Sequence, residues 1–144
     1  MGKISGIYAG LSAEYFVAAE LSRRDFCVSV TLKNTPGIDI LAVSPKTEKM
    51  YCIQVKEKQQ LGRTKVWLLK KNDEKVKGEN FFYAFVNLNM KEFKQPDIYI
   101  VPATTVAKRI KEYHKKKGGK DINMREFVFC KDEEKDYQNW DILK

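Results

Sequence analysis

Three polar side chains interrupt two apolar stretches of this sequence, Gly37-Ile38-Asp39-Ile40-Leu41 and Cys52-Ile53-Gln54-Val55-Lys56. Asp39 carries a carboxylate, Gln54 an amide and Lys56 an ammonium, so the three offer oxygen atoms to a cation and a positive charge to an anion. Burying such groups without partners is costly, and strands that only fill a core do not need them. Their presence in both stretches therefore indicates a functional site.

A hairpin brings the two stretches together. Residues Ile38–Val43 and Tyr51–Lys56 are rich in β-branched side chains, which favour strands, and the intervening residues Ser44–Lys49 have a turn-forming composition. Side chains alternate between the two faces of a strand, and directly opposed residues share a face. The antiparallel pairing therefore predicts which side chains meet.

All three polar side chains lie on one face of this hairpin. Folding about a centre near residues 46–47 places Asp39 opposite either Gln54 or Lys56, and parity excludes Val55 as its partner. On either register Asp39, Gln54 and Lys56 share a face. The side chains predicted for the other face are apolar: Ile38, Ile40, Ile53 and Val55.

A helix is predicted before the hairpin, over Ile7–Arg24. Apolar residues recur there at helical spacing, good helix formers dominate, and proline is absent. Its carboxylates belong to Glu14 and Glu20. Because the helix leads directly into a strand predicted at Cys27–Leu32, Glu14 can lie near the hairpin, whereas Glu20 lies farther down the helix.

In type and order these residues resemble the PD-(D/E)xK nuclease superfamily, which has the restriction-endonuclease-like fold. The resemblance rests on a helix with Glu14, then a strand with Gly37-Ile38-Asp39, then Gln54-Val55-Lys56 on the next strand. Further segments are similar to small bacterial stand-alone domains of this type, namely Asn80–Leu88, Pro96–Pro102 and Asn139-Trp140-Asp141. The resemblance covers most of the chain and implies an α/β (α+β) fold with a mixed central β-sheet flanked by helices.

The resemblance also implies a metal-dependent endonuclease that hydrolyses phosphodiester bonds of DNA. Such hydrolysis needs an activated water and compensation for the charge on the phosphate and leaving oxygens, which a divalent metal ion assists. Mg²⁺, or Mn²⁺, prefers oxygen ligands, and Asp39 is its expected central ligand. Gln54 Oε1 and a backbone carbonyl near Val55 complete the protein ligands, and Glu14 assists through water. Lys56 is expected to orient the attacking water.

Two departures from the family pattern leave a second function open. Pro36 lies two residues from its expected place before Asp39, and Gln54 stands where the family usually has an acidic residue. The change to Gln removes one negative charge from the ligand set, which weakens metal binding without substrate. The alternative function is therefore a catalytically weak or inactive module that keeps the nuclease fold and binds nucleic acid or a protein.

Each of these residues also has an ordinary structural explanation. Asp39, after Pro36-Gly37, is in a common position for a turn residue that bonds its own backbone. Lys56 can guard a strand edge, Gln54 can be an exposed position of the alternation, and Glu14 can be a solvated helix residue. The shared face, the chain order and the extended resemblance together favour a site.

The charge of the chain suits DNA as a partner. Its 27 Lys and Arg residues outnumber 19 Asp and Glu, which gives a net charge of +8. A basic run follows the hairpin and predicts a groove that tracks a nucleic-acid backbone: Lys56, Lys58, Arg63, Lys65, Lys70, Lys71, Lys75 and Lys77. Trp67, within this run, either stacks on a base or packs beneath the lysines as core. An RNA-binding accessory protein that uses only this basic face is a third alternative.

The remaining features predict a single domain, residues 1–144, in the cytoplasm. The hydrophobic content of 43% is ordinary, the apolar runs are too short to cross a bilayer, and a signal-peptide pattern is absent. Three cysteines without C-x-x-C spacing suit a reducing compartment, and the lone His114 is a poor ligand or general base. The chain has one predicted site, so an enzyme that cuts both strands of a duplex would favour a homodimer, with one site for each strand.

The order of the elements predicts a mixed sheet between helices. After the hairpin we expect an irregular basic segment, then two buried strands, Phe81–Leu88 and Ile98–Val101. A second helix begins near Ala103 and ends at Gly118-Gly119. The tail from Arg125 onward is expected to pack against the core through its aromatic and aliphatic side chains.

Overall fold

A computed structural model describes residues 2–32, 35–75 and 77–143 of the chain. Its helices and strands are α1 (Gly6–Ser22), β1 (Cys27–Val30), β2 (Ile40–Val43), β3 (Met50–Lys58), β4 (Val66–Lys70), β5 (Phe81–Asn87), β6 (Asp97–Pro102), α2 (Ala103–Lys116) and β7 (Met124–Val128). Three short 3-10 helices are η1 (Lys71–Glu74), η2 (Glu133–Gln138) and η3 (Trp140–Ile142). In the described ranges, no helix combines the length and the apolar character that a membrane crossing requires.

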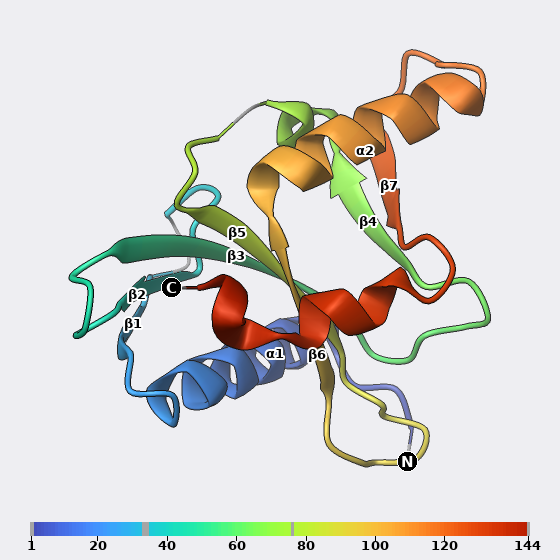
Figure 1. Cartoon of the computed structure of the whole chain (residues 1–144). Coiled ribbons are helices and arrows are strands. Elements are labelled where there is room, and N and C mark those ends of the chain that lie inside the picture. The colour runs from blue at the N-terminus through green and yellow to red at the C-terminus, as the bar shows by residue number, and fades with distance from the viewer. Residues whose placement is uncertain (1, 33–34, 76, 144) are drawn as a thin grey trace.

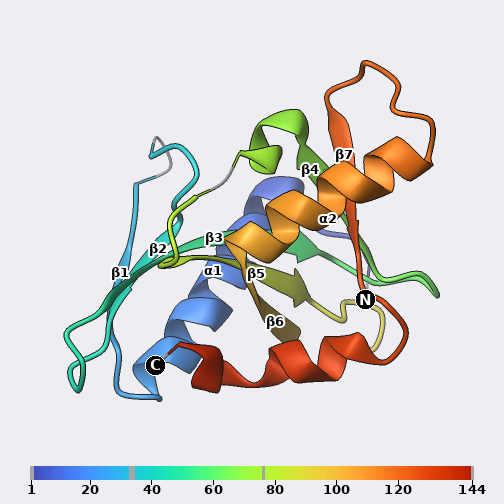
Figure 2. The same ribbon diagram turned by 45° about the horizontal axis from the view of Figure 1, so that its top comes forward.

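The main sheet is mixed and has the strand order β1-β2-β3-β5-β6. Antiparallel pairing joins β1 to β2, β2 to β3 and β5 to β6, whereas β3 and β5 run parallel. Helix α1 covers one face, while α2 and the two-stranded sheet of β4 and β7 lie over the other (Figure 1 and Figure 2). The predicted mixed sheet flanked by helices is confirmed.

Small residues on α1 let it lie close to the sheet. Ser5 caps the helix by accepting a hydrogen bond from the Tyr8 backbone N–H at 3.4 Å. Two hydrogen bonds between the Ile4 backbone and the Gln59 side chain, at 2.9 and 2.7 Å, join the start of α1 to the end of β3. The buried residues recur every fourth position: Ala9, Ala13, Val17 and Leu21.

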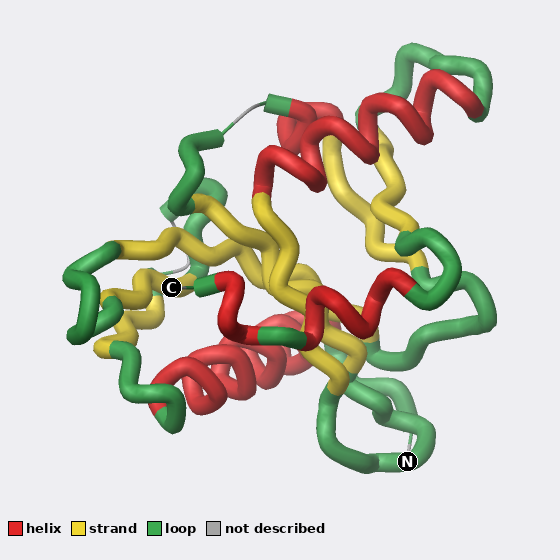
Figure 3. Tube along the Cα trace, viewed as in Figure 1, coloured by secondary structure: helices red, strands yellow, loops and turns green. Residues whose placement is uncertain are grey.

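The sequence predicted an irregular segment after the hairpin, and this prediction is wrong. Residues Val66–Lys70 form strand β4 (Figure 3). Its antiparallel partner is β7, in the tail, with Trp67 opposite Phe127. A strand of five residues whose partner lies far along the chain gives little local signal, since its pairing is wholly non-local. The tail residues expected only to pack against the core therefore also build a second sheet.

Trp67 belongs to the core on the α2 side of the main sheet. Its side chain is 1% exposed, and its indole N–H donates to the Val86 carbonyl at 3.3 Å. The ring centroid lies 5.3 Å from that of Phe85. The prediction that Trp67 binds nucleic acid by stacking on a base is wrong, because no face of the ring is available, and the core alternative is confirmed.

Candidate active site

The hairpin register is one of the two that the sequence allowed. Ile40 pairs with Ile53, which places Asp39 opposite Gln54. Ile40 and Ile53 are fully buried against α1, whereas Gln54 and Lys56 are half-buried. In the parallel register, Gln54 lies opposite Tyr83 of β5, a residue of the core on the other side of the sheet. The predicted division of the hairpin into an apolar and a polar face is confirmed.

Asp39 lies immediately before β2, at the point where this strand starts to pair with β3. Its backbone N–H donates to the Ile53 carbonyl at 2.9 Å, and its Oδ2 accepts a hydrogen bond from the Val55 N–H at 2.7 Å. The carboxylate therefore bonds to the neighbouring strand, and the alternative of a turn residue that bonds its own backbone does not apply. Within residues 2–32, 35–75 and 77–143, no group donates a hydrogen bond to Oδ1.

Lys77, which follows η1, projects into the same site. Its Nζ donates to Gln54 Oε1 at 3.1 Å. Because an ammonium has only donors, the amide must turn its oxygen toward Lys77. The Nζ atom also lies 3.7 Å from the position that a Cβ on Gly37 would take, and the φ of Gly37 is +73°. Lys77 thus lies between the turn before Asp39 and strand β3.

A buried pair of side chains lies behind Lys77. Its Nζ donates to Tyr83 Oη at 3.2 Å, and Tyr83 Oη donates to Asp73 Oδ1 at 2.7 Å. Asp73 is 8% exposed, and its other oxygen accepts from the Lys70 backbone N–H at 2.8 Å. Burial and the hydrogen bond to Asp73 raise the pKa of Tyr83, so its phenol stays neutral at physiological pH.

The charges of the site act on one another. Burial lowers the pKa of Lys77, and this is the largest effect on that group. The carboxylates of Asp73 and Asp39 raise the same pKa, while the ammonium of Lys56 lowers it. Lys56 and Asp39 are therefore both close enough to Lys77 for their charges to be felt, and the site contains two lysines.

Glu14 takes a different position from the other predicted site residues. It lies half-buried on α1, next to the buried Ala13, and α1 covers the apolar face of the hairpin. Gln54 and Lys56 belong to the opposite face. The structure thus brings Asp39, Gln54 and Lys56 together and leaves Glu14 on the α1 side, so its assistance through water stays a prediction.

The basic run is partly neutralised by acidic neighbours. Lys65 forms an ion pair with Glu134, and Lys71 Nζ lies 3.4 Å from an oxygen of Asp121. Other members of the run are half-buried or exposed: Lys58, Arg63 and Lys70. Their contact with nucleic acid stays a prediction.

The oxygen atoms at the site suit a hard divalent cation. They are the carboxylate of Asp39 and the Gln54 amide oxygen, which are ligand types that Mg²⁺ and Mn²⁺ accept. Among the described residues, no three His, Cys, Asp or Glu side chains lie together as a metal-binding group. A metal ion here would therefore depend on Asp39 and Gln54.

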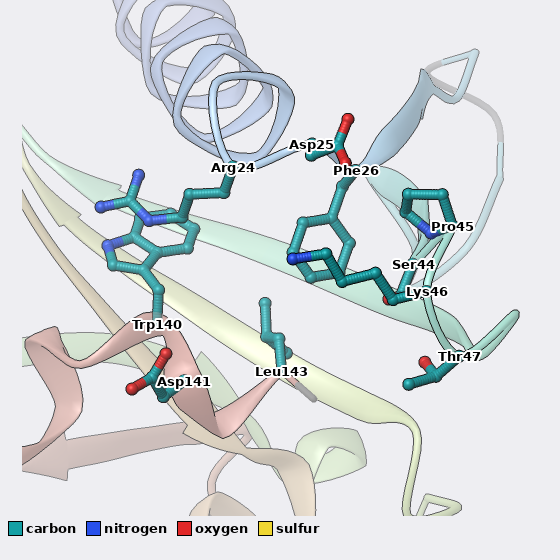
Figure 4. A pocket seen from close by; sticks show the side chains of 10 residues that line it. All are labelled: Arg24, Asp25, Phe26, Ser44, Pro45, Lys46, Thr47, Trp140, Asp141 and Leu143. Carbon is teal, nitrogen blue, oxygen red and sulfur yellow. The ribbon is translucent and has the colours of Figure 1, made fainter.

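The pocket shown in Figure 4 is a different place from this site. It is lined by residues from the end of α1, the hairpin turn and the tail. There the guanidinium of Arg24 lies 4.5 Å from the ring centroid of Trp140, and Leu143 is 3% exposed. The pocket lies where the tail packs on the core and contains none of the polar hairpin residues.

Lys77, Tyr83 and Asp73 were not predicted as site residues. The basic run included Lys77 but gave no reason to separate it from Lys75, which is exposed. Tyr83 lies in an apolar stretch, and only the parallel register of β3 and β5 places it beside Gln54. A charged residue such as Asp73 between lysines was the available signal, and sequence alone does not show that it is buried.

Comparison with solved structures finds a protein of similar fold. A bacterial homing endonuclease, I-Ssp6803I, has a similar structure, with a TM-score of 0.54 over 92% of this chain and 86% of that chain. The two sequences are 13% identical, so the likeness concerns the fold alone. No family model matches this chain, and no curated protein matches it in sequence.

Proposed function

We propose that this protein is a metal-dependent endonuclease of the PD-(D/E)xK type that hydrolyses phosphodiester bonds of DNA. The observation that carries the proposal is the position of Asp39, Gln54 and Lys56, on one face of a hairpin in a chain with the fold of a homing endonuclease. The three side chains are half-buried, which adds support, because burying polar groups costs free energy that a purely structural sheet would avoid.

Each residue has a role in this proposal. Asp39 and Gln54 would hold Mg²⁺ or Mn²⁺ through their side-chain oxygens, and the Val55 N–H keeps the Asp39 carboxylate oriented. The metal ion, when bound, polarises the phosphate and makes a water more acidic. The Lys56 ammonium holds the attacking water by hydrogen bonding and offsets negative charge that grows on the phosphate oxygens. Glu14 assists through water.

The basic run supplies the proposed contacts to the DNA backbone. Lys58 lies on the same face of β3 as Lys56, and Arg63 and Lys70 are exposed. Lys65 and Lys71 would exchange their acidic partners for phosphates. Contacts of this kind make the affinity fall steeply as salt concentration rises.

Cleavage of labelled single-stranded, duplex and four-way-junction DNA, with Mg²⁺ or Mn²⁺, tests the proposal. The native chain is compared with Asp39→Ala and Lys56→Ala, and with Glu112→Ala as a control, because Glu112 is an exposed carboxylate on α2. Cutting that needs metal, is lost in the first two variants and is kept in the control would support the nuclease. Cutting that survives Asp39→Ala would refute it.

One observation favours the alternative of a nuclease-fold module without turnover. Gln54 supplies no charge, so Asp39 contributes the one carboxylate among the three predicted hairpin residues. The Gln54 side-chain oxygen, moreover, already accepts a hydrogen bond from Lys77. Substitution Gln54→Glu separates the two functions. In a module that has lost turnover, the native chain does not cut and the added charge increases metal binding, whereas in a working enzyme the native chain cuts and the substitution changes activity little or lowers it.

The outward face of α1 supports the homodimer that two-strand cleavage would favour. Ile7 and Tyr8 are each 65% exposed there and Tyr15 is 60% exposed, while the helix contains neither Lys nor Arg. In a chain with net charge +8, an apolar face without positive charge is where two copies can approach with little repulsion. We therefore propose a second copy of this chain as the partner of this face.

A further inference from the structure

Lys77 has no assigned part in the chemistry described above, yet it contacts the proposed metal ligand directly. We propose that Lys77 keeps the metal position closed until DNA arrives: it holds Gln54 Oε1 in the free protein and transfers to a DNA phosphate in the complex. Metal loading then depends on DNA binding. The inference rests on the proposed function, because it concerns the same site.

The contacts of Lys77 place its ammonium where a metal ligand is needed. Its Nζ lies 3.1 Å from Gln54 Oε1, which is the oxygen that the metal ion would use. Gly37 and Tyr83 confine the same atom from two other sides, at 3.7 Å from the glycine Cβ position and 3.2 Å from Tyr83 Oη. An ammonium so close to Gln54 opposes the approach of a divalent cation by charge repulsion.

The position of the charges, rather than their sum, favours an anion over a cation beside Gln54 in the absence of DNA. Asp73 lies behind Tyr83, where it accepts the phenol hydrogen bond. In front of Tyr83 the site has the carboxylate of Asp39 and the two ammonium groups of Lys56 and Lys77, whose charges interact. Because Asp73 also acts on Lys77, two carboxylates balance two ammonium groups in number. The charge in direct contact with Gln54 Oε1 is nevertheless the Lys77 ammonium, at 3.1 Å, and at that position it repels Mg²⁺ and attracts a phosphate.

Lys77 can leave Gln54 when a phosphate enters. Both of its direct hydrogen-bond acceptors, Gln54 Oε1 and Tyr83 Oη, are neutral. A phosphate oxygen is charged, and hydrogen bonds between ionised partners are roughly twice as strong as neutral ones. The flexible four-carbon side chain of a lysine can make such a shift by rotation about its own bonds. Gln54 is then available as a ligand, and the phosphate adds the negative charge that Gln54 lacks.

Two binding measurements, neither of which involves DNA cleavage, test whether DNA binding precedes metal loading. Calorimetry with Mn²⁺ in the absence of DNA is expected to show that Lys77→Met binds the ion about tenfold more tightly than the native chain, since one repelling charge is gone. Binding of duplex DNA in the presence of EDTA is expected to become severalfold weaker in Lys77→Met, with the salt slope reduced by about one. A residue that only supported the fold would weaken both.

Matched variants make the outcomes distinct. Lys75→Met removes an exposed lysine two residues away and should leave Mn²⁺ affinity unchanged. Lys77→Gln keeps a hydrogen-bond donor without the charge, and it serves if Lys77→Met does not fold. If Asp39→Ala abolishes Mn²⁺ binding but neither Lys77 variant tightens it, the inference is overturned and the proposed function stands. If Asp39→Ala leaves Mn²⁺ binding unchanged, the proposed metal site itself fails.

Discussion

The two faces of β3 differ in what fills the space beside them. On one face Ile53 is fully buried and Val55 is 7% exposed, and both pack against α1. On the other face Gln54 and Lys56 are half-buried, and their surroundings come from the turn before β2, from β5 and from the segment after η1. The first face is covered by one helix, α1, whereas the second is surrounded by groups from several parts of the chain.

This difference separates residues that maintain the fold from residues of the proposed site. An apolar side chain on the α1 face contributes through its volume and can be replaced by another of similar size at small cost. On the polar face, each group depends on a particular atom nearby, such as Val55 N for Asp39 or Lys77 Nζ for Gln54. Substitutions on the two faces should therefore have different consequences for stability and activity.

The largest expected effect is on the polar face. Asp39→Ala should lower metal-dependent DNA cleavage by on the order of 10³-fold, because it removes the central ligand of the proposed metal ion. The loss of a partner for the Val55 N–H should cost about 1–3 kcal/mol in stability. Single-turnover cleavage and denaturant unfolding measure the two effects. An unaltered cleavage rate would show that the polar face is not the site of DNA cleavage.

The α1 face should respond in the opposite way. Ile53→Ala should lower the free energy of unfolding by about 2–5 kcal/mol, because it opens a cavity under α1 at a fully buried position. Cleavage per folded molecule should remain close to that of the native chain. Urea titration gives the stability, and activity is normalised to the folded fraction. A specific loss of activity at full folding would contradict the comparison.

Two tyrosines on the two faces offer a matched pair. Tyr83→Phe should destabilise the chain by about 1–3 kcal/mol, because the buried Asp73 loses a hydrogen-bond donor. Tyr51, on the α1 face, has a buried hydroxyl with no partner among the described residues, so Tyr51→Phe should be neutral or stabilise by about 1 kcal/mol. Thermal and urea unfolding compare them. Equal changes in the free energy of unfolding would show that a buried hydroxyl contributes the same on both faces of the sheet.

Sedimentation velocity tests the outward face of α1. Tyr15→Glu places a charge at a position that is 60% exposed, so it should leave the fold intact and shift the chain from dimer to monomer. Leu68→Glu, on β4, is the control, since Leu68 is 57% exposed but lies elsewhere. A native chain that is monomeric at high concentration would rule out the proposed second copy.

The smallest effect concerns pH and lies away from both faces of β3. The ion pair with Arg109 lowers the pKa of Glu133 from 4.5 to about 2. Because the folded-state pKa is depressed, the stabilisation is present above pH 4.5 and is lost as pH falls from 4.5 toward 2. Unfolding free energies of the native chain should fall over this window more steeply than those of Glu133→Gln. Parallel curves would assign the acid sensitivity to other groups.

Much of the hairpin could be predicted because its information is local. Alternation and the short turn limited Asp39 to two partners, and the structure selects Gln54. Helical spacing gave α1 and α2 within a few residues of their observed bounds. These predictions rest on side-chain period and turn composition, which operate over neighbouring residues.

The parts that the sequence did not predict depend on long-range pairing. The pairing of β4 with β7 joins segments at 66–70 and 124–128, and no local pattern selects this partner. The position of Lys77 depends on the parallel register of β3 and β5, which places Tyr83 beside Gln54. Trp67 was placed in a basic run by its neighbours in sequence, whereas its neighbours in space are aromatic.

The pairing of β4 with β7 also sets the order in which the site is completed during synthesis. Asp73, which holds Tyr83, lies in η1 directly after β4, and Arg125 of β7 is 5% exposed and pairs with Glu74 of η1. A ribosome adds about 5–20 residues per second, so the hairpin with Asp39 emerges several seconds before β7. A growing chain therefore has Asp39, Gln54 and Lys56 before the segment that supports Lys77 is fixed by β7. If Lys77 acts as proposed, we expect the chain to acquire its DNA-dependent control only when its last strand is in place.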